Sequence, residues 1–243
     1  MKRFFTYILA ALFSLYLLVS LAWGNAAARH RLYKGFDVTV VDSARAQYVT
    51  AAEVAAHLSK YIKADENTLL QDINTEDLEE QLYQNRLIEE VRCYKTPSGL
   101  LRVDISQRVP ILRVLGDSAA YFLDEHGKLM PANLSEAVAV PVATGHISSA
   151  YARETLYPFA RFLQKNDFWR AQVEQIYVDA HQNVELTPRV GDHRILMGKL
   201  TAYEEKLDNL RCLYEQAFSK CGWNKYSIIN LKYKNQVVCT RRK

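Results

Sequence analysis

The chain lacks the short motifs that mark many enzymes and cofactor-binding proteins. Its 243 residues contain no G-x-S-x-G, no G-x-x-x-x-G-K and no G-x-G-x-x-G, which leaves nucleophile-elbow hydrolases, P-loop proteins and dinucleotide-binding domains without support. None of the six histidines lies four residues from another, the spacing of helical metal-binding pairs. The sequence therefore predicts no catalytic, cofactor-binding or metal-binding residue and no small-molecule substrate, although groups distant in sequence can still converge in a fold.

Strong charge and low-complexity sequence are also missing. The net charge is +4, and the basic run at residues 241–243 is too short, and too far from other basic and aromatic clusters, to indicate a nucleic-acid partner. Apolar residues make up 49% of the chain, an ordinary content for a globular protein. The length allows one large domain or two small ones.

One long apolar stretch, Phe4 to Trp23, contains no charged residue. As a helix it would span roughly 30 Å, the thickness of a bilayer core. A cleaved signal peptide is the rival interpretation, since Ala26-Ala27-Ala28 could be a cleavage site, but the apolar core of a signal peptide is shorter, about 7–15 residues. We therefore expect a transmembrane helix at 4–23, a cytoplasmic tail at 1–3 and a remainder outside the cytoplasm.

The four cysteines show no C-x-x-C spacing, so neither a zinc ribbon nor a thioredoxin-like site is supported. Outside the cytoplasm an even number of cysteines permits disulfides, and buried reduced thiols are an equally good interpretation. The sequence does not decide between them for Cys93, Cys212, Cys221 and Cys239.

After a short linker at 24–35, residues 36–108 follow the order strand, helix, helix, strand, strand. Thr50 and Glu53 form a capping-box pattern, and apolar residues four apart follow it, as expected of an amphipathic helix. The turn sequence Thr96-Pro97-Ser98-Gly99 separates two alternating segments and predicts a β-hairpin.

Residues 109–243 read as a mixed sheet with two helices, so the predicted fold class is α+β. Short apolar segments broken by Gly, Pro and Asp predict strands. In the run Asp124-Glu125-His126-Gly127, turn chemistry explains every residue, and the rival interpretation is the catalytic group of a membrane-anchored periplasmic hydrolase. Helices are expected at about 152–165 and 200–220, and a closing strand at 226–239.

The closing segment YSIINLKYKNQVVC is strand-forming throughout, and no Gly or Pro interrupts it. A terminal strand with one free edge can accept a partner strand, unless both edges are already covered within the chain. Ile229, Leu231 and Tyr233 should face the core, and the lysines of the other face should favour an acidic partner segment. The candidate partner-binding residues are Tyr226, Ile228, Asn230, Leu231, Lys232, Tyr233, Lys234 and Val237.

Four short motifs in this order resemble the FtsQ/DivIB family of bacterial division proteins. SQRVPILRV resembles the family's E-R-x-P-x-A-x-V junction between domains, and AYFLDEHGKLMP resembles its aromatic-aromatic-x-D-x-x-G stretch. VPVATG resembles L-P-x-x-x-G, and INLKYKNQVV resembles the closing D-L-R-Y-x-N-x-x-x-V strand. Gln107 stands where Glu is common, and Asn230 where Asp is common.

The resemblance implies a POTRA-like domain at 36–108 and an FtsQ-type β domain at 109–243. It also implies a non-enzymatic scaffold that links early division components to later septal cell-wall synthesis components. Its implied partners are FtsB/FtsL-like single-span proteins, with a partner segment added alongside the last strand. A POTRA-containing protein of outer-membrane assembly or secretion is the alternative, but its long barrel would require many more strands.

Overall fold

The computed structural model describes residues 7, 12–20, 30–43, 47–63, 65, 67–117, 119–134, 138–218, 220, 222–234 and 236–242. The chain divides into two compact units, before and after the Gln107–Arg108 bond. Residues 12–20 are helical, and no helix in the described ranges is both long and apolar enough to cross a membrane. Half of the expected span at 4–23 lies outside the described residues.

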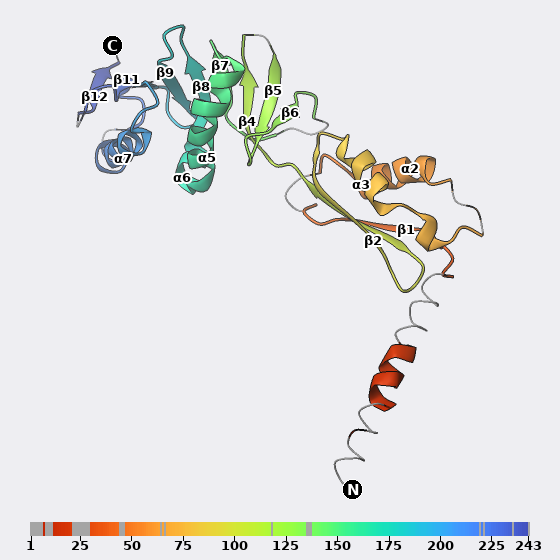
Figure 1. The fold of residues 1–243 in the computed structure, drawn as a ribbon. Helices are drawn as coiled ribbons and strands as arrows, with labels where there is room; N and C mark the ends of the chain where they lie inside the picture. The colour runs from red at the N-terminus through yellow and green to blue at the C-terminus, as the bar shows by residue number, and fades with distance from the viewer. Residues whose placement is uncertain are drawn as a thin grey trace. The chain divides into compact units, whose positions relative to one another are not determined.

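The first unit is a three-stranded sheet covered by two helices (Figure 1). Its strands lie in the order β1-β3-β2, with β1 parallel to β3 and β2 antiparallel to it, so the predicted β-α-α-β-β order is confirmed. A 3₁₀ turn, η1, precedes the second helix. The elements are β1 (Phe36–Val40), α2 (Ala51–Tyr61), η1 (Leu70–Asp72), α3 (Thr75–Tyr83), β2 (Ile88–Lys95) and β3 (Leu101–Gln107).

Local sequence signals account for the ends of these helices. Thr50 caps α2 with the predicted capping box, in which its hydroxyl accepts from the Glu53 amide and the Glu53 carboxylate accepts from the Thr50 amide. Asn74 caps α3 by accepting from the Glu76 amide. The apolar faces of both helices pack against the inner face of the sheet in one core, where Leu101, Val103 and Ile105 are fully buried.

Part of the expected linker belongs to the first unit. Tyr33 donates its amide to the Thr68 carbonyl, Lys34 donates to the Gly99 carbonyl, and Leu32 forms a β-bridge with Leu69. These backbone bonds hold residues 32–34 against the unit, within the linker expected at 24–35. Small and basic residues suggested that linker, and composition does not reveal hydrogen bonds made by backbone groups.

The second unit is a nine-stranded mixed sheet in the order β12-β11-β10-β9-β8-β7-β4-β5-β6. The β4·β7, β7·β8 and β10·β11 pairs are parallel, and the other pairs are antiparallel. The strands are β4 (Pro110–Leu115), β5 (Ala120–Asp124), β6 (Leu129–Pro131), β7 (Val142–Gly145), β8 (Val173–Val178), β9 (Val184–Pro188), β10 (Arg194–Gly198), β11 (Tyr226–Asn230) and β12 (Val238–Arg241).

Two long helices pack on this sheet, as predicted, and a short third one was missed. The first is continuous through α4 (Ser149–Tyr151), a π-turn η2 (Ala152–Leu156) and α5 (Tyr157–Lys165), and is followed by the short α6 (Asp167–Gln172). The second is α7 (Tyr203–Leu213) with a π-turn η3 (Tyr214–Phe218). On one stripe of this helix, Leu207, Leu210, Tyr214 and Phe218 are buried in the core, and Tyr203 is half-buried against it.

The Asp124–Gly127 run forms the β5–β6 turn, which confirms its turn interpretation. Asp124 is 1% exposed, and its carboxylate accepts from the amides of His126 (2.9 Å) and Lys128 (2.7 Å) and from Arg108 (2.7 Å). Gly127 has φ +73°, a left-handed conformation that favours glycine. The buried Arg108–Asp124 pair thus joins the junction motif to the D-x-x-G motif, and loss of either member of such a pair costs about 3–5 kcal/mol.

The expected single strand at 226–239 is two strands. β11 ends at Asn230, residues 231–234 lead into a turn, and β12 begins at Val238 and pairs antiparallel with β11. Both edges of β11 are therefore covered within the chain, by β10 and β12, and the free edge belongs to β12. The Asn230 carboxamide accepts the Lys232 amide at 3.0 Å, a local bond that turns the chain out of the strand.

Candidate strand-docking site

The open edge of β12 is the first element of the candidate site. The Arg242 amide donates to the Lys225 carbonyl at 3.0 Å, so the amide of Arg242 faces β11. Because successive residues of a strand point their amides in alternate directions, those of Cys239 and Arg241 face the open edge. Val238 is 45% exposed, and Thr240 and Arg241 are also exposed. The outer edge of β12 therefore has no neighbouring strand in the described sheet, and another strand can bond there.

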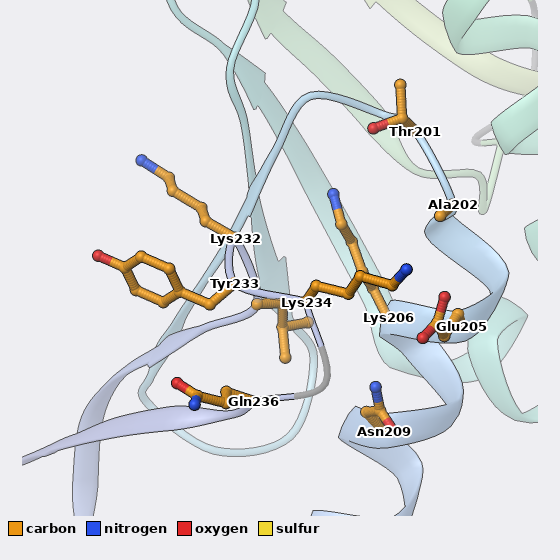
Figure 2. Close-up of a pocket in the computed structure, with 10 residues that line it drawn as sticks. Thr201, Ala202, Glu205, Lys206, Asn209, Lys232, Tyr233, Lys234 and Gln236 are labelled. Carbon is orange, nitrogen blue, oxygen red and sulfur yellow. The ribbon is translucent and has the colours of Figure 1, made fainter.

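A hollow of about 360 Å³ lies beside the start of β12 (Figure 2). One wall is the N-terminal end of α7 with the turn before it, and the other is the turn between β11 and β12. In Figure 2, Lys234 reaches from the turn toward α7, whereas Tyr233 points away from the helix. The lining residues are Thr201, Ala202, Glu205, Lys206, Asn209, Leu231, Lys232, Tyr233, Lys234 and Gln236.

The hollow has a positive charge, because three lysines and one glutamate line it. The Lys206 ammonium donates to the carbonyls of Met197 (2.9 Å) and Lys199 (2.8 Å), and burial lowers its pKa. Within the described ranges, no carboxylate lies at ion-pair distance from Lys232 or Lys234. Both lysines can therefore meet an acidic group from outside the chain.

The structure separates the eight predicted partner-binding residues into two groups. Leu231, Lys232, Tyr233 and Lys234 come together around the hollow. The other four lie elsewhere in the C-terminal segment: Tyr226, Ile228 and Asn230 are on β11 and are half-buried, and Val237 is packed against the core just before β12.

The predicted inward face was partly wrong. Ile229 and Leu231 are buried, at 0% and 2% exposure, as expected. Tyr233 is 58% exposed, because it lies in the turn, where the alternation of a strand no longer applies. Tyr226 packs against the core, with its ring stacked on Phe218 at 5.8 Å between centroids.

The end of β12 is anchored by residues that the sequence did not single out. The Arg242 guanidinium lies 2.5 Å from the Asp192 carboxylate and also donates to the Asp192 carbonyl. His193, next to it, is 2% exposed, and its Nε2 lies 2.7 Å from the Tyr214 hydroxyl. No sequence signal links Asp192 to Arg242, because 50 residues separate them and an exposed ion pair has no motif.

The pKa of His193 is lowered to about 4, chiefly by burial and also by the nearby Arg242 charge, while Asp192 acts in the opposite direction. The Nδ1 atom of His193 is buried without a hydrogen-bond partner in the described structure. The imidazole is therefore neutral at pH 7. Protonation would place a charge among the rings of Tyr214, Phe218 and the rest of this aromatic cluster.

The titratable side chains of the described residues do not form a metal site. In the described part of the chain, no three His, Cys, Asp or Glu side chains gather closely enough to hold a metal ion. Asp124, the centre of the hydrolase alternative, is enclosed by the turn that its own carboxylate organises. Cys93 is a buried free thiol whose pKa is raised to about 12, chiefly by burial, and Cys212 is an exposed free thiol.

Comparison with known families decides the identity of both units. A family model described as FtsQ/DivIB, C-terminal related, matches residues 109–240, and one described as a POTRA-like domain matches residues 32–106. The chain belongs to the FtsQ/DivIB-related family. This family consists of non-catalytic division proteins, and membership suggests a division-related role with periplasmic domains. None of the curated proteins compared with the chain matches it.

The buried His193 predicts acid sensitivity of this FtsQ-related domain. Since its pKa falls from 6.5 in the unfolded chain to about 4 in the folded one, its contribution to stability is complete above pH 6.5. That contribution is lost as the pH falls toward 4, and it amounts to about 3 kcal/mol. Urea unfolding of the full chain between pH 7 and 4, followed by the fluorescence of Trp169 and Trp223, measures it.

In the His193→Gln variant the pH dependence of the unfolding free energy should be shallower, whatever its absolute stability. The control is His181→Gln, at an exposed histidine, which should keep the wild-type dependence. Equal slopes for wild type and His193→Gln would show that this side chain does not couple folding to protonation.

Proposed function

We propose that the chain is a membrane-anchored, non-enzymatic scaffold of the bacterial divisome. Residues 4–23 would hold it in the inner membrane, with the N-terminus in the cytoplasm and both units in the periplasm at the division septum. It would link early division components to later septal cell-wall synthesis components. The observation that carries this proposal is an open strand edge at the C-terminal end of an FtsQ/DivIB-related domain.

We further propose that an extended segment of an FtsB/FtsL-like single-span protein pairs with β12. Strand addition would give the partner backbone bonds to the outer edge of β12, including the Arg241 amide, and alternate side chains would set its register. β12 suits this role because β11 holds it on one side and its other side has no strand in the described sheet. The proposed pairing strand is therefore β12, the strand that follows β11 along the chain.

The charge of the hollow supports an acidic partner. Lys232 and Lys234 lie in the turn that leads into β12, so a segment paired with β12 would have its neighbouring residues beside them. Carboxylates there would gain attraction, chiefly in the rate of association and in specificity. A partner with no Asp or Glu next to its pairing strand would contradict this part of the proposal.

The substitution Arg241→Pro tests the pairing edge. Proline removes the outward amide of Arg241 and favours extended backbone at Thr240, so the bonds to β11 can remain. We expect the affinity of the full chain for its FtsB/FtsL-like partner to fall about tenfold or more. The measurement is a titration of the purified partner, first identified by mass spectrometry of proteins captured from the source membranes.

Arg241→Ala serves as the matched control, because it removes the same charge and keeps the amide. Circular dichroism must show that both variants are folded. If Arg241→Pro binds as tightly as Arg241→Ala, the partner does not bond this edge, and the docking site lies elsewhere.

Lys234→Glu tests the charge of the hollow. We expect slower association with the partner and a smaller effect of salt on the rate, because an attractive charge becomes a repulsive one. Stopped-flow or surface-binding kinetics at two ionic strengths give both quantities. Lys128→Glu, an equal charge change on an exposed residue at the β5–β6 end of the sheet, is the control. Equal rates for the two variants would rule out steering by the hollow.

A further inference from the structure

The first unit has a long sheet edge of its own. β2 has eight residues and lies at one side of the three-stranded sheet. Edge strands of this length offer rows of unpaired amides that invite pairing with another chain, and proteins usually protect them. The contacts of β2 show how this edge is protected.

Two outward amides of β2 are bonded by side chains of α3. The Val91 amide donates to the Tyr83 hydroxyl at 3.2 Å, and the Cys93 amide donates to the Glu79 carboxylate at 2.6 Å. Both acceptors lie on one helical face, and both donors lie on one side of the strand. Two of the amides that an added strand would bond, those of Val91 and Cys93, are therefore already occupied.

The spacing of helix and strand makes this double contact possible. Residues four apart on a helix are separated by about 6 Å along its axis, and residues two apart on a strand by about 6.6 Å. Because the helix and the strand run in opposite directions, Glu79 reaches Cys93 while Tyr83 reaches Val91. Leu78 is buried beside Glu79 and fixes this face of α3 against the core.

A third contact continues the same row. The Lys95 ammonium donates to the Gln71 carbonyl at 2.9 Å, so the turn before α3 also covers the β2 edge. Val91, Cys93 and Lys95 are alternate residues of one strand. The shared side of these three contacts indicates a row that closes one edge and not a set of unrelated surface bonds.

We propose that Glu79 and Tyr83 are edge-closing residues, which keep β2 from pairing with β2 of a second copy of this chain. In the pairing that they prevent, Val91 would lie opposite Cys93 of the second copy in an antiparallel ladder. This register uses the outward amides of Val91 and Cys93 in each copy and brings Glu89 opposite Lys95, which have opposite charges. The inference does not depend on the division role or on β12.

The test removes the two side-chain acceptors at the β2 edge and measures hydrogen exchange at the amides that they bond. In the full chain with Glu79→Ala and Tyr83→Phe, hydrogen exchange at the amides of Val91 and Cys93 should be about tenfold faster, or more, at low protein concentration. As the concentration rises, the variant should form dimers in sedimentation experiments, and the same amides should regain protection. The wild-type chain should stay protected, without dimers through this edge, across the same range.

Two results would overturn the proposal. One is wild-type exchange at both amides in the double variant, and the other is fast exchange with a monomer at every concentration. Glu79→Gln is the matched control, because its side-chain carbonyl can still accept the Cys93 amide, so the edge should stay closed. If Glu79→Gln formed dimers, the negative charge of Glu79, and not its hydrogen bond to the Cys93 amide, would be what keeps the β2 edge from pairing. Circular dichroism confirms that each variant is folded.

Discussion

The parallel ladder between β10 and β11 is the constraint on which the C-terminal half of the second unit depends. Parallel neighbours require a crossover, and α7 with η3 supplies it by burying Leu207 and Leu210 against the sheet. Ile229 of β11 and Leu231, which directly follows β11, are buried in the same core. With β11 fixed in this way, the last residues of the chain can add one further strand, and β12 becomes the edge.

The same placement explains why the candidate site has two parts. The turn that leaves β11 must pass the N-terminal end of α7 before it enters β12, and the hollow forms between them. Strand edge and positive hollow are therefore consecutive along the chain. A partner segment longer than four residues would contact both. Backbone pairing with β12 would then supply affinity, and the charge of the hollow would supply specificity.

The two units treat their sheet edges differently. In the first, α3 directs a carboxylate and a hydroxyl at the outward amides of β2. In the second, Arg242 and Asp192 hold the end of β12 through side chains, and the outer edge of β12 has no neighbouring strand in the described sheet. This contrast is what a scaffold needs if strand pairing is to occur at a chosen edge.

Local chemistry made much of the fold predictable from the sequence. The capping box at Thr50, the turn at Asp124–Gly127 and the stripe of α7 each depend on neighbours in sequence, and each is present. The break after Asn230 was missed because strand propensity of Leu231 and Tyr233 outweighed the carboxamide's ability to turn the chain. The pairing of Asp192 with Arg242, and of Glu79 with Cys93, is set by tertiary placement, which no local pattern encodes.

Hydrogen exchange of the full chain, free and bound to its FtsB/FtsL-like partner, tests the central claim most directly. If the partner adds a strand to β12, the amide of Arg241 should become strongly protected in the complex, while those that already bond β11 change little. If the partner binds and the Arg241 amide exchanges as fast as in the free chain, the edge of β12 is not the docking site.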